Sequence, residues 1–281
     1  MTTAVILATA CAVVYGTADF LGGMATKRSR VFAVVALSQA AGLVLVLALL
    51  PVLPGGFSAE ALWWGLGAGL VGAAGLVLFY RALATGTMSV VAPTAAVTSA
   101  ALPVVFGLVT GERPHPVALA GIGLALAAVV LISKEAPREK TPGSLSSLLV
   151  ALAAGAGFGG FFILLAQAPA STGMWPLVGA RLSSLALVVL LAVTAGHSLR
   201  PSGGSLRIIA GAGVLDMAAN VLYLVAKEHG MLSLVAVLVS LYPASTLLLA
   251  RYVLGERLRA VQITGVACAL GAVALIALPG G

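Results

Sequence analysis

Long apolar runs alternate with short polar connections along the whole chain. Each run has about 20 residues, which at about 1.5 Å per residue is enough for an α-helix to cross a hydrocarbon core of roughly 30 Å. A helix is expected because a backbone in contact with lipid must satisfy its own hydrogen bonds. Breaking the runs at glycine, proline and charge clusters predicts ten membrane-spanning helices, at residues 4–24, 31–53, 59–82, 87–110, 116–133, 145–168, 174–195, 205–228, 231–254 and 260–278.

The composition excludes an ordinary water-soluble domain. Of the 281 residues, 61% are hydrophobic and only 8% are charged, whereas about a quarter of the residues in soluble domains are charged. The net charge of +7 comes from short basic clusters between the apolar runs, which indicates membrane topology rather than a nucleic-acid partner. Cys11 and Cys268 lie inside apolar runs without metal-ligand spacing. We therefore expect no metal, no cofactor and no bound nucleic acid.

The second half of the sequence resembles the first when the chain is shifted by 144 positions. Two pairs of stretches then align: LFYRALATGTMSVVA (78–92) with LYLVAKEHGMLSLVA (222–236), and VTGERP (109–114) with VLGERL (253–258). The longest connection, SKEAPREKTPG, lies between the halves. The duplication predicts two repeats of five spans, residues 1–140 and 141–281. Because five is odd, the second repeat must be inverted relative to the first, an arrangement common in secondary transporters. The predicted fold class is an all-α integral membrane protein built from two inverted five-helix repeats.

Basic residues are distributed unevenly among the connections. The even-numbered connections carry only Arg113 and Lys227, whereas the odd-numbered ones carry twelve: Lys27, Arg28, Arg30, Arg81, Lys134, Arg138, Lys140, Arg200, Arg207, Arg251, Arg257 and Arg259. By the positive-inside rule the odd-numbered connections are cytoplasmic and both termini face outward. The sequence thus predicts a multi-pass protein of the cell membrane.

Three charged residues fall well inside the predicted spans: Asp19, Arg181 and Asp216. An ionised group in hydrocarbon costs at least about 2.5 kcal/mol, so such residues usually face a partner or an aqueous cavity. Asp216 lies near the middle of the eighth span, and Asn220 and Tyr223 follow on the same helical face. This polar stripe indicates a binding site. The alternatives are a static ion pair between Arg181 and one aspartate, and a stripe that only hydrogen-bonds a neighbouring helix.

Asp19 lies nearer the end of its span, with Tyr15 one turn earlier. Its depth favours a gate or an ion relay, in which the carboxylate takes up a proton or a cation as the cavity opens to either side. Gln39 and Arg181 occupy equivalent places in spans two and seven. Inverted repeats would point both toward the same central region, where Arg181 would hold a substrate carboxylate or neutralise an empty aspartate.

Other patterns indicate packing rather than binding. Gly155 and Gly159, spaced four apart, fit close helix contacts between small residues. For Pro93 and Pro103 in span four and Pro243 in span nine two interpretations stay open: the prolines free backbone carbonyls that line a cavity, or they only kink packed helices. The Gly-Glu-Arg triplets at 111–113 and 255–257 end spans four and nine, where capping or anchoring of a helix end is the favoured interpretation over catalysis.

Several of these stretches together resemble the EamA-like branch of the drug/metabolite transporter superfamily. They are YGTADFLGG in span one, VGAR in span seven, the GERP and GERL endings, and the five-plus-five arrangement of spans. The resemblance implies a secondary carrier of small metabolites, often amino acids or related compounds, with a central cavity between the two halves. The first half departs from the family pattern at Gln39, where an arginine is common, and the charges of the connections indicate a reversed orientation.

The sequence therefore predicts a secondary active transporter, and not an enzyme, that moves a small metabolite by alternating access with proton or cation coupling. Its expected partners are the substrate, the coupling ion and membrane lipid, and it would act as a monomer or homodimer. One alternative is a membrane scaffold or chaperone. Another is an intramembrane aspartyl protease with Asp19 and Asp216 as its dyad, although Tyr15 is not adjacent to Asp19 and GVLD lacks a glycine directly before Asp216.

Overall fold

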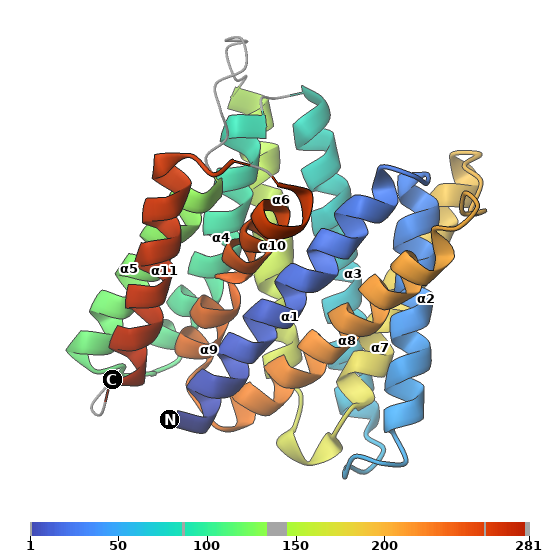
Figure 1. The fold of residues 1–281 in the computed structure, drawn as a ribbon. Coiled ribbons are helices and arrows are strands. Elements are labelled where there is room, and N and C mark those ends of the chain that lie inside the picture. The colour runs from blue at the N-terminus through green and yellow to red at the C-terminus, as the bar shows by residue number, and fades with distance from the viewer. Residues whose placement is uncertain (1, 86–87, 134–144, 256, 279–281) are drawn as a thin grey trace.

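The computed structural model describes residues 2–85, 88–133, 145–255 and 257–278. Within them lie ten helical stretches that are long and apolar enough to cross a membrane, as predicted. Figure 1 shows them as a bundle of steeply inclined helices. The helices are α1 (Thr2–Thr26), α2 (Val31–Leu49), α3 (Ala59–Thr85), α4 (Met88–Val109), α5 (Pro116–Ser133), α6 (Leu145–Ala166), the short 3-10 helix η1 (Ala170–Thr172), α7 (Trp175–Thr194), α8 (Leu206–Glu228), α9 (Leu232–Val239), α10 (Tyr242–Leu254) and α11 (Ala260–Ala277).

Two of the predicted spans differ in detail from the structure, both near a proline. The second span ends at Leu49 rather than at residue 53, close to Pro51, which cannot continue the helical hydrogen-bond pattern. The ninth span is broken into α9 and α10 at Ser240 and Leu241. Pro243 lies directly after this break and has no N–H to donate to the preceding turn. The boundary predicted between the two repeats, at residues 140 and 141, lies outside the described residues.

The packing of the helices follows the inverted duplication. α1 packs along α8, and α6 packs along α3, which is the same pairing with the repeats exchanged. In the same way α2 packs on α8 and α7 packs on α3. The two last spans, α5 and α11, pair at one edge of the bundle, and α2 and α7 lie at the other (Figure 1). Helices of both repeats therefore surround the centre of the molecule.

The two parts of the broken ninth span, α9 and α10, differ in how deeply they are buried. We call the face where α1 and α10 end the basic face, and the face where α1 begins and α11 ends the terminal face; they lie at the top and bottom of Figure 1. All eight residues of α9, on the terminal side, are buried against helices that include α4 and α1. No residue of α10, on the basic side, is buried. The broken span is thus packed more tightly toward the terminal face.

Small residues bring helices of different repeats into backbone contact, as the four-residue glycine spacing predicted. On α6, a Cβ at Gly155 would lie 2.5 Å from the carbonyl oxygen of Ala95 on α4, and one at Gly159 would lie 3.0 Å from that of Ser99. On α1, a Cβ at Gly16 would lie 2.5 Å from the carbonyl oxygen of Tyr242 on α10. These glycines are therefore packing positions.

Side-chain hydroxyls reinforce the contact between α1 and α10. The hydroxyl of Ser245 donates to the carbonyl of Ala12 at 2.9 Å, and that of Thr246 donates to the carbonyl of Gly16 at 3.0 Å. Both donors come from the first turn and a half of α10. This end of α10 is therefore fixed on α1 close to the break at Ser240.

We expect Gly16→Ala to weaken the packing of α10 on α1, because the added Cβ would meet the Ser245 hydroxyl and, at 2.5 and 2.8 Å, backbone atoms of Tyr242 and Thr246. Overpacking of this kind typically costs about 1–3 kcal/mol. Gly23→Ala on the same helix is the matched control, since nothing lies within 4 Å of its Cβ position. Thermal unfolding of the purified proteins should show a lower melting temperature for Gly16→Ala only. Equal melting temperatures would contradict the packing role.

Candidate functional site

Three helices from both repeats meet at the guanidinium of Arg181. Arg181 lies on α7, and its Nη1 donates to Oε1 of Gln39 on α2. Its Nη2 donates to Oδ2 of Asp216 on α8 and forms an ion pair with it. The structure therefore brings together Gln39, Arg181 and Asp216, which sequence analysis placed in one central region. Gly42, one turn after Gln39, leaves space for the arginine, whose Nε would lie 3.4 Å from a Cβ there.

The two partners of the ion pair differ in exposure. The side chain of Arg181 is 9% exposed and that of Asp216 is 35% exposed. The guanidinium is thus almost withdrawn from solvent and depends on its two acceptors, whereas the carboxylate keeps one side open. This ion pair fits both the role in which Arg181 neutralises an aspartate and the alternative of a static ion pair between Arg181 and one aspartate.

The polar stripe on α8 divides into an accessible end and a buried end. Asn220 is 2% exposed, and its Nδ2 donates to the backbone carbonyl of Asp216 at 2.8 Å. Its Oδ1 is buried without a hydrogen-bond partner. Tyr223 is fully buried, and its hydroxyl donates to the carbonyl of Phe162 on α6 at 2.8 Å. Tyr223 therefore matches the alternative interpretation, in which the stripe hydrogen-bonds a neighbouring helix, and Asp216 is the least buried of the three.

Asp19 is an exposed residue on the inner face of α1. An α-helix turns by about 100° per residue, so around the axis of α1 Asp19 lies within roughly 20° of Ala12 and Ala8. It lies more than about 100° from Val13 and Ile6. Ala12 and Ala8 are buried, whereas Val13 and Ile6 are 53% and 62% exposed and mark the outer face. The carboxylate also interacts electrostatically with Asp216 on α8. Asp19 is therefore exposed on the side of α1 that faces the bundle, in the half of α1 nearer the basic face.

An aromatic cluster lies next to these charges. The ring of Tyr15 contacts those of Phe162 and Tyr242, with centroids 6.3 and 6.2 Å apart, and Phe162 contacts Tyr223 at 4.8 Å. Tyr15 interacts electrostatically with Asp216 and Arg181, and Tyr242 interacts with Asp19. Rings from α1, α6, α8 and α10 therefore form a wall beside the two carboxylates.

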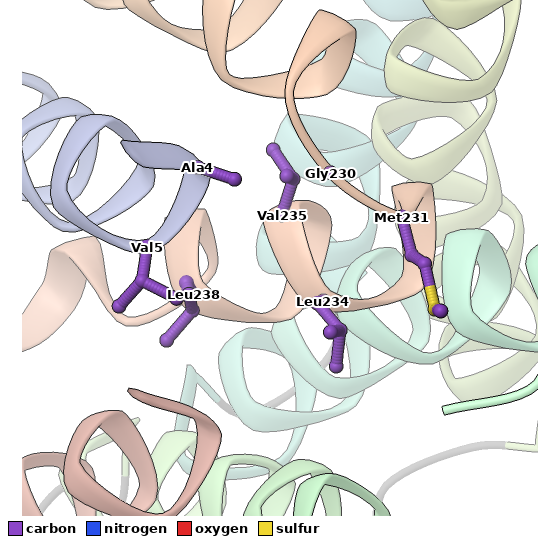
Figure 2. Close-up of a pocket in the computed structure, with 7 residues that line it drawn as sticks. All are labelled: Ala4, Val5, Gly230, Met231, Leu234, Val235 and Leu238. Atoms are coloured by element: carbon purple, nitrogen blue, oxygen red, sulfur yellow. The ribbon is translucent and has the colours of Figure 1, made fainter. Parts of the chain in front are cut away.

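Two small pockets lie near the terminal face, and neither is lined by Asp19, Arg181 or Asp216. Figure 2 shows the first, an apolar pocket between α1 and α9 lined by Ala4, Val5, Gly230, Met231, Leu234, Val235 and Leu238. The second includes Lys227 and Glu228 at the end of α8. The central cavity that the family resemblance implies is not one of these two pockets. Within the described ranges, no three His, Cys, Asp or Glu side chains gather closely enough to hold a metal ion.

Glu112 forms a contact between the repeats that sequence analysis did not foresee. Its carboxylate accepts hydrogen bonds from the backbone N–H groups of Leu232, at 2.6 Å, and Ser233, at 2.9 Å. These are the first residues of α9, so Glu112 caps a helix, as its motif suggested, but a helix of the other repeat. The corresponding Glu256 lies outside the described residues. The contact holds α9 in its buried position at the terminal face.

Comparison with known proteins decides the family. The model of the EamA-like transporter family matches the chain twice, over residues 2–134 and 145–278. The chain belongs to the EamA-like transporter family. The two matches fit the two inverted repeats, and members of this family are transporters rather than enzymes. For this EamA-like protein a small-molecule substrate and a multi-pass place in a lipid bilayer follow from the family and from the ten apolar spans.

Solved structures confirm the fold of this EamA-like protein. The likeness to one crystal structure covers 96% of this chain and 94% of the other, with a TM-score of 0.78 at 20% identity. A likeness at that identity extends to the arrangement of the helices. No curated protein matches the chain.

Proposed function

We propose that this EamA-like protein is a secondary active transporter that moves a small metabolite across the cell membrane by alternating access. The observation that carries the proposal is the cluster at Arg181, where polar and charged groups of both inverted repeats meet inside an apolar bundle. Buried ionisable groups are costly in a membrane and are typical of substrate and ion pathways. The candidate site consists of Asp19, Asp216, Asn220, Arg181 and Gln39, with Tyr15 and Tyr223 beside them.

The two repeats, 1–140 and 141–281, are proposed to rock against each other around this site. Support comes from the difference between the two faces. α9 is buried and capped by Glu112 at the terminal face, whereas α10 has no buried residue and Asp19 is exposed toward the basic face. On the proposed cycle this conformation is the one open toward the basic face, and by the positive-inside rule that face is proposed to be cytoplasmic. Transport requires the opposite state, in which α9 moves away from Glu112.

Asp19 is proposed as the group that couples transport to a proton or cation gradient. Within the described residues its carboxylate makes no hydrogen bond and no ion pair, unlike Asp216. The groups that interact with it electrostatically are Asp216 on α8 and Tyr242 on α10, and Tyr15 lies one turn earlier on its own helix. None of these is a base that would neutralise it, so the carboxylate is available to an ion entering from the basic face.

Uptake into proteoliposomes tests the proposal. Purified protein is reconstituted, energised with a pH or a sodium gradient, and offered labelled amino acids, amines, sugars and nucleosides. We expect one class to accumulate, and Asp19→Asn to abolish the gradient-driven part because the amide cannot exchange a proton or bind a cation with its own charge. Asp19→Glu, which keeps the charge, is the matched control. If no gradient drives uptake of any compound and counterflow is also absent, the protein is not such a carrier.

A further inference from the structure

We propose that the transported substrate is an organic cation, whose ammonium group binds the carboxylate of Asp19 against the rings of Tyr15 and Tyr242. This inference rests on the carrier function proposed above and names the chemical class that the carrier recognises. It depends on three features of the described residues: the net charge of the site, the absence of a partner for Asp19, and the aromatic wall beside it.

The site carries an excess of negative charge. The charged residues well inside the spans are two acids, Asp19 and Asp216, and one base, Arg181. Arg181 is paired with Asp216, which leaves one carboxylate uncompensated within electrostatic reach of the pair. In a low-dielectric interior such a charge is stabilised by a bound cation, so the site favours a positively charged ligand over a neutral or negative one.

The arginine is not free to receive an anionic substrate. Its two terminal nitrogens are engaged by Gln39 and Asp216, and its side chain is 9% exposed. A substrate carboxylate would have to displace one of these acceptors and would lie close to two negative side chains. Asp19, by contrast, is exposed on the inner face of α1 and has no hydrogen-bond or ion-pair partner among the described residues.

The aromatic rings suit an ammonium group. Tyr15 is one turn before Asp19 on the same face of α1. The ring of Tyr242 on α10 lies beside that of Tyr15, with centroids 6.2 Å apart, and Tyr242 interacts electrostatically with Asp19. The faces of tyrosine rings attract cations through their quadrupole, most strongly where water is excluded. Neither tyrosine hydroxyl has a hydrogen-bond partner among the described residues, although both side chains are partly buried. A cation next to Asp19 would therefore gain one charged contact and contacts with two rings.

Binding of a matched series of compounds to the full-length protein in detergent tests the inference. Phenethylamine, phenethyl alcohol and phenylpropionate have similar size and differ in charge, and tetraethylammonium adds a cation that cannot donate a hydrogen bond. By isothermal titration, we expect both cations to bind and phenethylamine to bind at least about tenfold more tightly than the alcohol and the carboxylate. This comparison uses the wild-type protein, so it does not depend on the folding of any variant.

Three variants locate the cation. Asp19→Asn should weaken phenethylamine binding by at least about tenfold, whereas Tyr15→Phe should retain it because the ring is kept, and Tyr15→Leu should lose it. Melting temperatures close to wild type show that each variant is folded. Equal affinities for the three compounds, an unchanged affinity in Asp19→Asn, or no binding of either cation would each overturn the inference.

Failure of this inference can be told apart from failure of the carrier function. If proteoliposomes accumulate a neutral or anionic compound and the cations do not bind, the carrier stands and the cation site is wrong. If the cations bind at Asp19 but no gradient or counterflow moves any compound, the site stands and the carrier is wrong.

Discussion

Asp216→Asn is expected to abolish uptake of the substrate that the wild-type protein accumulates, while the protein remains folded in the membrane. The carboxylate is the ionic partner of Arg181 and the open end of the polar stripe on α8. The amide of an asparagine at this position has the same shape and still accepts a hydrogen bond from Arg181. It leaves the arginine side chain, which is 9% exposed, without a neutralising charge. The site then carries a different net charge, and a ligand selected by charge no longer fits.

Removing either partner of the pair should also lower stability, and the two effects should differ. Unpairing a buried ion typically costs about 3–5 kcal/mol, whereas an exposed one costs much less. Asp216→Asn leaves the more buried partner, Arg181, unpaired, whereas Arg181→Met leaves unpaired a carboxylate that is 35% exposed. Asp216→Asn should therefore lower the melting temperature more than Arg181→Met does. The double variant should recover melting temperature without recovering uptake. Such a recovery separates the electrostatic role from general packing.

Glu228→Gln is the matched control, because it neutralises an exposed acid at the end of the same helix. Its uptake and melting temperature should match those of the wild type. The same comparison separates the carrier from a membrane scaffold, which would keep its binding partners in Asp216→Asn. Wild-type uptake by Asp216→Asn would remove Asp216 from the candidate site.

Much of the architecture can be predicted from the sequence because the bilayer imposes a length and a polarity on every span. The ten apolar runs, the duplication and the central meeting of Gln39 with Arg181 all follow from local pattern and from symmetry. The same symmetry cannot show which aspartate pairs with Arg181. Asp216 and Asp19 have the same charge, and only the packing of α7 on α2, and of α2 on α8, places Asp216 within hydrogen-bond distance.

Other features depend on contacts between repeats that no local pattern encodes. Pro243 follows the break in span nine, but Pro93 and Pro103 lie inside an unbroken α4. A proline alone therefore does not predict where a span breaks. The exposure of Asp19 depends on how the helices of both repeats pack around α1. The partner of Glu112 is 120 residues away in sequence, and only the tertiary fold brings it near.

Glu112→Ala is expected to release α9 and to open the terminal face. The carboxylate accepts two hydrogen bonds from N–H groups that have no partner within their own helix, and it lies at the positive end of the helix dipole. Hydrogen bonds to a charged group contribute about 1.5–3 kcal/mol each. Their loss should therefore raise the opening equilibrium of α9 by about two to four orders of magnitude, at about 1.4 kcal/mol per tenfold change.

Amide hydrogen exchange measures this opening directly. In Glu112→Ala, exchange at Leu232, Ser233 and the following turn of α9 should accelerate, while α8 amides around Asn220 keep their wild-type protection. Glu112→Gln should be intermediate, because the amide oxygen accepts one hydrogen bond and its NH₂ group cannot accept the second. Arg113→Gln, which changes the exposed neighbour, is the matched control. Unchanged exchange in Glu112→Ala would mean that packing alone holds α9, and that the contact between Glu112 and α9 does not control which face of the carrier is open.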